Sequence, residues 1–262
     1  MKKILSFILT FSFISAGFTQ SKTIVIGVPE SAPYFSEKIP GNGMVCELLT
    51  EAFKNQGYEV SFQFLPLARL YRSLKESKVT CIPYGLGSLT PEEKLQVFET
   101  RPVYFSQYVL FYKKSKFPQG VNFTNLSELR NYVVEVKNGN RPIINLLTSN
   151  GLKIDLGYDS ENMFLKLKEE RADFLAIPDI GGLDYINSLK LNPDDYGYTR
   201  SISSSSRTMM FLKKDNDQII NDFNSGFSVI IKNDKYRKIL EKYYGRGSVP
   251  DSVMQVTSFW RK

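Results

Sequence analysis

Buried-strand patterns alternate with amphipathic helix patterns along the chain, and this alternation constrains the fold more than any other feature. Residues 23–28 (TIVIGV) are β-branched and apolar and run into a proline-rich turn, which indicates a buried strand. Apolar side chains then recur at the spacing of one helix face between residues 43 and 57. Residues 60–64 alternate apolar and polar side chains, as in a strand with one buried face. A second helix at 67–74 and a strand at 79–82 complete a first α/β unit.

The same pattern continues through the rest of the chain. The predicted strands are 108–112, 132–136, 154–156, 174–177 and 208–212, and the predicted helices are 142–147, 163–170, 219–231 and 236–244. Strands that alternate with helices favour an α/β fold with a mostly parallel sheet. Residues 246–262 give no periodic signal and are left without a predicted element.

The amino terminus has the pattern of a secretory signal peptide. Lys2 and Lys3 precede an apolar run at 4–14, and small residues follow at 15–17. The run is shorter than the roughly 20 residues that a membrane-spanning helix needs. We therefore expect residues 1–19 to be cleaved and the mature protein to be released, soluble, into the periplasm.

The chain contains no histidine, which excludes Ser-His-Asp triads, Cys-His pairs and histidine-ligated metal sites. Its formal net charge of +7 falls to +5 once Lys2 and Lys3 leave with the signal peptide. Basic and acidic residues are interspersed, without the clustered basic patch of a nucleic-acid-binding protein. We expect no cofactor, no metal and no nucleic-acid partner.

Four segments carry a resemblance to a known family. They are 43–48 (GMVCEL), 77–92, 158–179 and 211–245. In this order and spacing they resemble family 3 of the bacterial extracellular solute-binding proteins, which have the type II periplasmic-binding fold. The resemblance implies a two-lobed α/β protein with a mostly parallel sheet in each lobe and two crossing hinge strands.

The resemblance also implies where the chain divides. Lobe 1 is expected from residues 20–107 and 208–262, and lobe 2 from residues 108–207. The crossing strands would be 108–112 and 208–212. Ligand would lie in the cleft between the lobes, near the carboxyl ends of the strands, where open α/β sheets usually bind.

Four candidate ligand-binding residues belong to lobe 1. Tyr34 follows the first strand, where the family presents an aromatic ring, although it could equally pack within its loop. Arg69 lies in the first turn of a helix whose apolar face is supplied by other residues, so it is free to face the cleft or to stay on the surface. Tyr84 follows the third strand, and Thr90 opens the next loop.

Three further candidates belong to lobe 2. Asn140 and Arg141 precede a predicted helix start, where the family binds a ligand carboxylate, and Arg141 could supply positive charge there. Asp179 matches the family position that receives a ligand ammonium, or it could instead cap a turn before two glycines. For Arg141 the alternative is an ordinary loop arginine with no ligand contact.

The loop after Thr90 departs from the family pattern. Amino-acid binders of the family carry an arginine there that holds the ligand α-carboxylate, whereas this chain has Glu93. A carboxylate in a low-dielectric cleft would repel that group. We therefore expect ordinary α-amino acids to bind weakly or not at all. Either Lys94, Arg69 or Arg141 holds the anion, or the ligand presents a cationic or neutral group to this loop. Arg69→Ala should weaken binding more than Arg72→Ala.

The two cysteines, Cys46 and Cys81, could form a disulfide in an oxidising compartment if their helix and strand are neighbours. The alternative is two buried, unpaired thiols.

We expect a monomeric, non-catalytic solute-binding protein for a small polar molecule, amino-acid-like or another organic ion, that works with an inner-membrane ABC transporter permease. The alternatives are a ligand-sensing partner protein and a periplasmic dehydratase or lyase that uses carboxylates. Glu47, Glu92, Glu93 and Asp179 are the carboxylates that such an enzyme could use.

Overall fold

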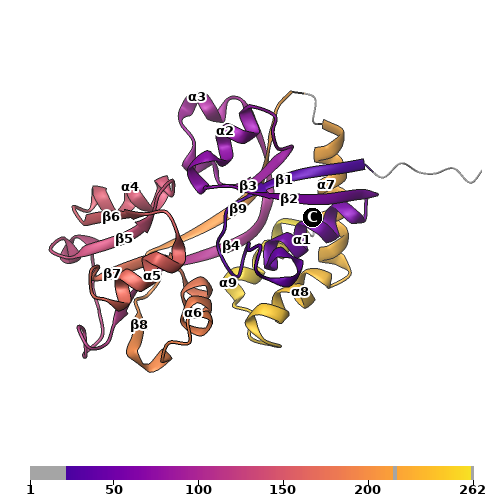
Figure 1. The fold of residues 1–262 in the computed structure, drawn as a ribbon. Helices are drawn as coiled ribbons and strands as arrows, with labels where there is room; N and C mark the ends of the chain where they lie inside the picture. Colours follow the sequence, from indigo (N-terminus) through magenta and orange to yellow (C-terminus); the bar gives the residue numbers. More distant parts are fainter. Residues whose placement is uncertain (1–21, 215–216, 261–262) are drawn as a thin grey trace, which may run out of the picture.

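Figure 1 shows a computed structural model, which describes residues 22–214 and 217–260. The predicted signal peptide, residues 1–19, lies outside these described residues. Within them, no helix combines the length and the apolar character needed to span a membrane.

One nine-stranded sheet runs through both lobes. Its spatial order is β2 (Tyr58–Phe64), β1 (Lys22–Val28), β3 (Cys81–Tyr84), β9 (Ser203–Leu212), β4 (Val97–Lys113), β7 (Phe174–Pro178), β5 (Val133–Lys137) and β6 (Lys153–Gly157), and β8 (Tyr196–Tyr198) pairs with β4. Strands β1 to β3 pair in parallel in lobe 1, and β5 to β7 do so in lobe 2. The expected two-lobed α/β class with mostly parallel pairing in each lobe is confirmed.

Helices cover both faces of the sheet in lobe 1 (Figure 1). On one face lie α1 (Met44–Lys54), α7 (Asp217–Lys232) and α8 (Lys235–Tyr244), whose apolar sides form a single core with the strands. On the other face η2 (Leu67–Arg69) leads into α2 (Leu70–Lys75), with α3 (Pro91–Lys94) nearby. The chain therefore returns to lobe 1 after building lobe 2, which ties its two ends into one core.

Lobe 2 has the same layered plan on a smaller scale. Helix α4 (Arg141–Ser149) packs on one face of its sheet, and α5 (Ser160–Lys168) and α6 (Asp179–Ser188) pack on the other. The short 3-10 helices of the chain are η1 (Pro40–Asn42), η3 (Leu86–Ser88), η4 (Leu126–Leu129) and η5 (Pro193–Asp195).

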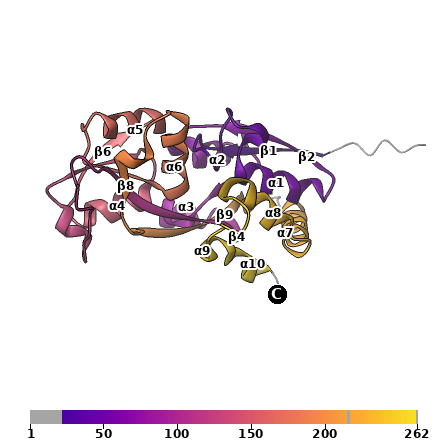
Figure 2. The same cartoon turned by 90° about the horizontal axis from the view of Figure 1, so that it is seen from below.

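Strands β4 and β9 pair with each other and run from one lobe to the other (Figures 1 and 2). Both begin earlier than the predicted crossing strands at 108–112 and 208–212. In β4 the register shifts on both sides of Pro102, because proline cannot donate to the ladder and is tolerated only at such an irregularity. The proline and the charged residues around it conceal the first half of this strand in the sequence.

Some elements were not predicted. Asp179 opens helix α6 rather than a turn, and Gly181 and Gly182 lie inside that helix. A Cβ at Gly182 would come within 2.2 Å of the Phe111 ring, so the glycine allows close packing against β4.

The tail forms α9 (Asp251–Met254) and α10 (Val256–Trp260), which are too short to show a period. Buried Trp260 donates from Nε1 to the Pro102 carbonyl at 2.6 Å.

The structure has Cys46 and Cys81 as free, buried thiols, which corrects the predicted disulfide. Cys46 lies on the buried face of α1 and Cys81 begins the central strand β3, and each packs into the apolar core of lobe 1. Burial raises the pKa of both thiols and so keeps them protonated and unreactive. They act as small hydrophobic side chains.

Candidate functional site

The two crossing strands present one polar face to the space between the lobes. Tyr104, Ser106 and Tyr108 alternate along β4, so their side chains point the same way. In β9, Arg207 pairs in register with Tyr104, and Ser205 pairs with Ser106. Residues that are directly opposite in an antiparallel pair share a face. The hinge thus places a guanidinium among tyrosine and serine side chains.

A cavity lies on this face, and the empty space in it, open solvent included, is about 750 Å³. Its polar lining comprises Ser31, Tyr34, Tyr84, Ser88, Tyr104, Ser106, Tyr108, Lys137, Asn140, Ser160 and Arg207, and its apolar lining includes Phe35, Leu67, Met163, Ala176 and Ile177. Many of these residues end or follow strands β1, β3, β5 and β7. The site is therefore at the carboxyl ends of parallel strands in both lobes.

Two cations line the cavity. The Arg207 guanidinium donates from Nη1 to Ser205 Oγ at 2.8 Å, and Tyr104 and Tyr108 lie close enough to influence its pKa. Lys137 Nζ donates to Ser160 Oγ at 3.0 Å and to the Glu30 backbone carbonyl. Burial lowers the pKa of Lys137, which the more distant carboxylates of Asp159 and Glu30 only partly offset.

Tyr34 contributes a buried hydroxyl that has no hydrogen-bond partner among the described residues. Its side chain is 2% exposed and lines the cavity. Burial raises the pKa of this hydroxyl, and the nearby Tyr244 and Asp179 raise it further. A neutral phenol held in this way is a donor available to a bound molecule, and leaving it unpaired costs free energy.

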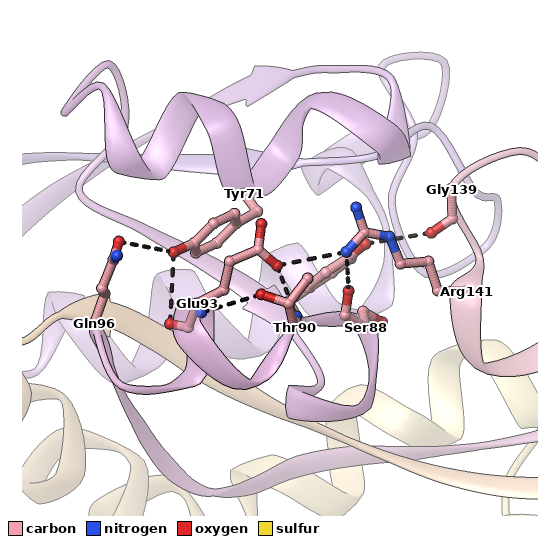
Figure 3. Close-up of polar contacts among 8 residues, drawn as sticks. Tyr71, Ser88, Thr90, Glu93, Gln96, Gly139 and Arg141 are labelled. Carbon is pink, nitrogen blue, oxygen red and sulfur yellow. Dashed lines mark hydrogen bonds and ion pairs between the residues drawn. The ribbon is translucent and has the colours of Figure 1, made fainter.

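The lobes meet at one side of the cavity, where α4 of lobe 2 faces η3 and α3 of lobe 1. Figure 3 shows Arg141 extended towards lobe 1. Its Nη1 donates to the Ser88 carbonyl at 3.1 Å and lies 3.4 Å from Glu93 Oε2. The hydroxyl of Tyr84 donates to the Gly139 carbonyl at 3.4 Å. These contacts, with that from Lys137 to Glu30, hold the lobes together around the cavity.

The structure brings three of the predicted site residues, Tyr34, Tyr84 and Asn140, to the cavity lining. Arg141 lies beside the cavity and contacts lobe 1 instead. The sequence predicts that the Glu93 carboxylate lies in the cleft and repels a ligand carboxylate there. In the structure Glu93 forms a capping box with Thr90, accepting from the Thr90 backbone N–H at 2.8 Å, and its carboxylate faces Arg141.

The remaining predicted residues lie outside the lining. Arg69 and Thr90 are exposed, and Thr90 accepts from the Glu93 backbone N–H at 3.3 Å as the N-cap of α3. Asp179 Oδ1 accepts from the Ile180 backbone N–H at 2.7 Å, and burial raises the pKa of its carboxyl. The Asp179 carboxylate is therefore already used as a hydrogen-bond acceptor in the first turn of α6.

Sequence reasoning missed Arg207, Lys137, Tyr104 and Tyr108. The signal for the tyrosines was the alternation of Tyr104, Ser106 and Tyr108, which the proline at 102 separates from the rest of the strand. Arg207 is the one charged residue in the run 203–208 (SSSSRT). Nothing local marks it as a cavity residue, because its position depends on pairing with a strand about 100 residues earlier.

The carboxylates considered for catalysis do not gather in the cavity. Glu47 accepts from the Tyr243 hydroxyl at 2.7 Å and pairs with Lys242, while Glu92 and Glu93 lie on α3. Of the residues that the structure describes, no Asp or Glu lines the cavity. The same described ranges contain no cluster of residues suited to hold a metal ion.

Two α/β lobes joined by a pair of crossing strands, with a polar cavity between them, define a solute-binding protein of the periplasmic-binding class. The sequence agrees with this class. The chain belongs to the bacterial extracellular solute-binding proteins, family 3, whose sequence profile matches residues 24–246. A search of curated protein sequences gave no match.

Solved structures share this fold at low sequence identity. A mutant of ArgBP from T. maritima is 21% identical, with a TM-score of 0.71 over 86% of this chain and 96% of that one. A substrate-binding protein of an ABC uptake transporter from Streptococcus pneumoniae, with bound histidine, is 19% identical, with a TM-score of 0.73 over 87% of this chain and 94% of that one. A histidine kinase sensor domain is also 19% identical, with a TM-score of 0.73 over 85% of this chain and 96% of that one.

Proposed function

We propose that this chain is a periplasmic solute-binding protein that captures a small molecule in the cavity between its lobes and delivers it to an ABC-type transporter. The observation that carries the proposal is the cavity itself, which combines an unpartnered tyrosine hydroxyl, two cations and residues from both lobes. Tyr34, Tyr84, Asn140, Lys137 and Arg207 are its proposed ligand contacts.

Membership of family 3 supports a binding role, and the likeness to a substrate-binding protein of an ABC uptake transporter supports delivery to a membrane partner. The absence of histidine from the chain removes the commonest general base from any catalytic alternative. We propose that the protein releases its ligand unchanged, acts as a monomer, and reaches the periplasm after cleavage near residue 19.

A melting-temperature screen of the mature protein against a metabolite library tests ligand capture. A ligand at about 100 times its dissociation constant stabilises the folded state by about 2.7 kcal/mol, which shifts the melting temperature measurably. Mass spectrometry after long incubation then tests catalysis, because a binding protein returns the hit with its mass unchanged. Chemical turnover of the hit would instead support a carboxylate-based enzyme.

Export and delivery need separate measurements. In a Gram-negative host the mature protein should appear in the osmotic-shock fraction, and its amino-terminal sequence should start close to residue 20. A sequence that starts at Met1 would contradict export. Loss of uptake of the identified ligand when the gene is deleted would support delivery to a transporter, and unchanged uptake would contradict it.

A further inference from the structure

The charge of the cavity lining is one-sided. Arg207 and Lys137 line it, and no acidic side chain from the described parts of the chain does so. Neither cation forms an ion pair within residues 22–214 and 217–260, and their hydrogen bonds go to hydroxyl and carbonyl oxygens. Partly desolvated cations without a counter-charge are costly, and a bound anion relieves that cost.

Arg207 is the better placed of the two to hold an anion. It comes from a crossing strand, with Tyr104 directly opposite in the sheet ladder, so its position is fixed by the core of the hinge. A guanidinium has five donors in a planar fork, and Ser205 occupies only one nitrogen. The Tyr104 and Tyr108 hydroxyls lie beside the guanidinium, and a bound carboxylate would replace them on the remaining donors through two parallel hydrogen bonds.

Two further donors face the same cavity. The Tyr34 hydroxyl has no partner among the described residues. The Lys137 ammonium has three donors, of which the Glu30 carbonyl and Ser160 take two. Unused donors from both lobes favour a ligand that presents oxygen acceptors.

The rest of the lining favours a flat apolar body on that ligand. Tyr34, Tyr84, Tyr104 and Tyr108 are each at most 9% exposed and all line the cavity, together with Phe35. Aromatic walls supply large contact areas to planar groups at little entropic cost.

The described lining of the cavity offers no carboxylate to the ammonium group of an α-amino acid. Asp179, the residue that the family resemblance assigns to the ammonium, lies outside the lining and already accepts a hydrogen bond from the Ile180 backbone N–H. The ammonium would instead face a cavity that already contains two cations, and like charges at short range repel.

We propose that the cavity selects a small organic carboxylate with a flat apolar body and no ammonium group, anchored by Arg207. This inference rests on the proposed function, since it names the class of solute that the cleft captures. It differs from the zwitterionic ligands that the family resemblance implies.

Titration calorimetry with charge-matched aromatic probes tests it. The probes are benzoate, phenylacetate and 3-phenylpropionate, the primary amide of each, and L-phenylalanine, which adds an ammonium to 3-phenylpropionate. We expect at least one carboxylate probe to bind, and its amide and L-phenylalanine to bind about tenfold or more weakly.

Three variants test the role of Arg207. Arg207→Gln should lower the affinity for the carboxylate probe by at least about tenfold, and Arg207→Lys should restore part of that affinity. Arg130→Gln, at an exposed arginine outside the lining, should keep the affinity within about twofold of wild type.

Tyr34→Phe gives a second variant in case Arg207→Gln does not fold. It removes a hydroxyl that has no partner, so the melting temperature should not fall, whereas carboxylate affinity should drop about threefold to tenfold. Equal binding of carboxylate and amide, or unchanged affinity in Arg207→Gln, would overturn the inference.

Failure of every aromatic probe also overturns it, and the library screen then separates the two proposals. A zwitterionic or cationic hit leaves the proposed function intact and removes only the anion preference. No hit in any charge class removes the proposed function itself.

Discussion

Arg141 Nη1 in lobe 2 lies 3.4 Å from Glu93 Oε2 in lobe 1, and the same carboxylate oxygen accepts a hydrogen bond from the Thr90 backbone N–H (Figure 3). One side chain therefore both caps helix α3 and contacts the opposite lobe. The Tyr71 hydroxyl donates to Gln96 Oε1 at 3.2 Å, just after the end of the same helix. Helix α3 is thus held in lobe 1 by contacts that do not involve lobe 2.

Removal of this interlobe pair should weaken ligand binding without unfolding the protein. Arg141→Ala loses the bonds to Ser88 and Glu93 that join the lobes beside the cavity, and we expect about fivefold weaker ligand affinity by calorimetry. Glu93→Gln keeps a side chain able to complete the capping box, so it should lose less. Affinity as in the wild type for Arg141→Ala would show that closure does not need this contact.

Gly139 tests how closely the lobes must approach. Its φ is +87°, and a Cβ there would come within 2.7 Å of the Ala68 backbone nitrogen in lobe 1. Gly151 has φ +76° with no atom within 4 Å of its Cβ position, so Gly151→Ala is a matched control for backbone strain alone. Both alanine variants should lose about 1 kcal/mol of stability in urea unfolding. Only Gly139→Ala should also lose affinity, by about tenfold, and equal affinities would contradict a close-contact role.

The buried carboxylate of Glu135 makes lobe 2 sensitive to Lys166. Glu135 is 0% exposed, and Lys166 Nζ lies 3.0 and 3.1 Å from its two oxygens and 2.9 Å from Asp155 Oδ2. Burial raises the pKa of Glu135, which Lys166 opposes. Lys166→Met should therefore cost about 2–4 kcal/mol in urea unfolding. The exposed Lys168→Met on the same helix should stay within about 0.5 kcal/mol, and similar losses for both would contradict this account.

Asp179 gives a pH dependence with a definite sign. Burial raises the pKa of its carboxyl above the ordinary 3.8, so the folded state binds more protons than the unfolded state between the two pKa values. Stability from this group therefore falls as pH rises through that interval and stays lower above it. Asp179→Asn keeps the acceptor for the Ile180 N–H and should melt higher than wild type at pH 7, by an amount that shrinks towards pH 4. A gap that widens on acidification would contradict the prediction.

Two free thiols per chain are expected when the purified protein is denatured without reductant and counted with a thiol reagent. Cys46 and Cys81 are both buried in the core of lobe 1, and burial raises the pKa of each, so neither should react before unfolding. A count of zero would show that a disulfide forms after all, since no other cysteine is present in the chain.

Much of the fold could be predicted because its strands and helices obey local periodicity. The alternation at 60–64 appears in the structure as alternating half-buried and exposed residues of the edge strand β2. The predictions failed where packing overrides local preference. A turn before Gly181 and Gly182 is one of the two predictions for Asp179, yet both glycines lie within α6, and at Gly182 the Phe111 ring leaves no room for a Cβ.

The candidate site could be predicted only in part. Tyr34, Tyr84 and Asn140 reach the cavity because each follows a strand, and strand ends converge at one edge of a parallel sheet. Arg69 was selected as a free arginine at a helix start, but the structure leaves it exposed. The arginine that lines the cavity is Arg207, and the polar run around it, residues 203–208, does not indicate that it is buried.

The sequence alone determined the class of fold, the order of its elements and the absence of histidine chemistry, because periodicity and composition act over short stretches of chain. Only the tertiary structure decided which charges meet. The pairing of β4 with β9 sets Arg207 opposite Tyr104, and the packing of lobe 2 against α3 places Arg141 beside the Glu93 carboxylate. These contacts join residues 103 and 48 positions apart, so no local pattern specifies them, and they determine the charge that a ligand meets.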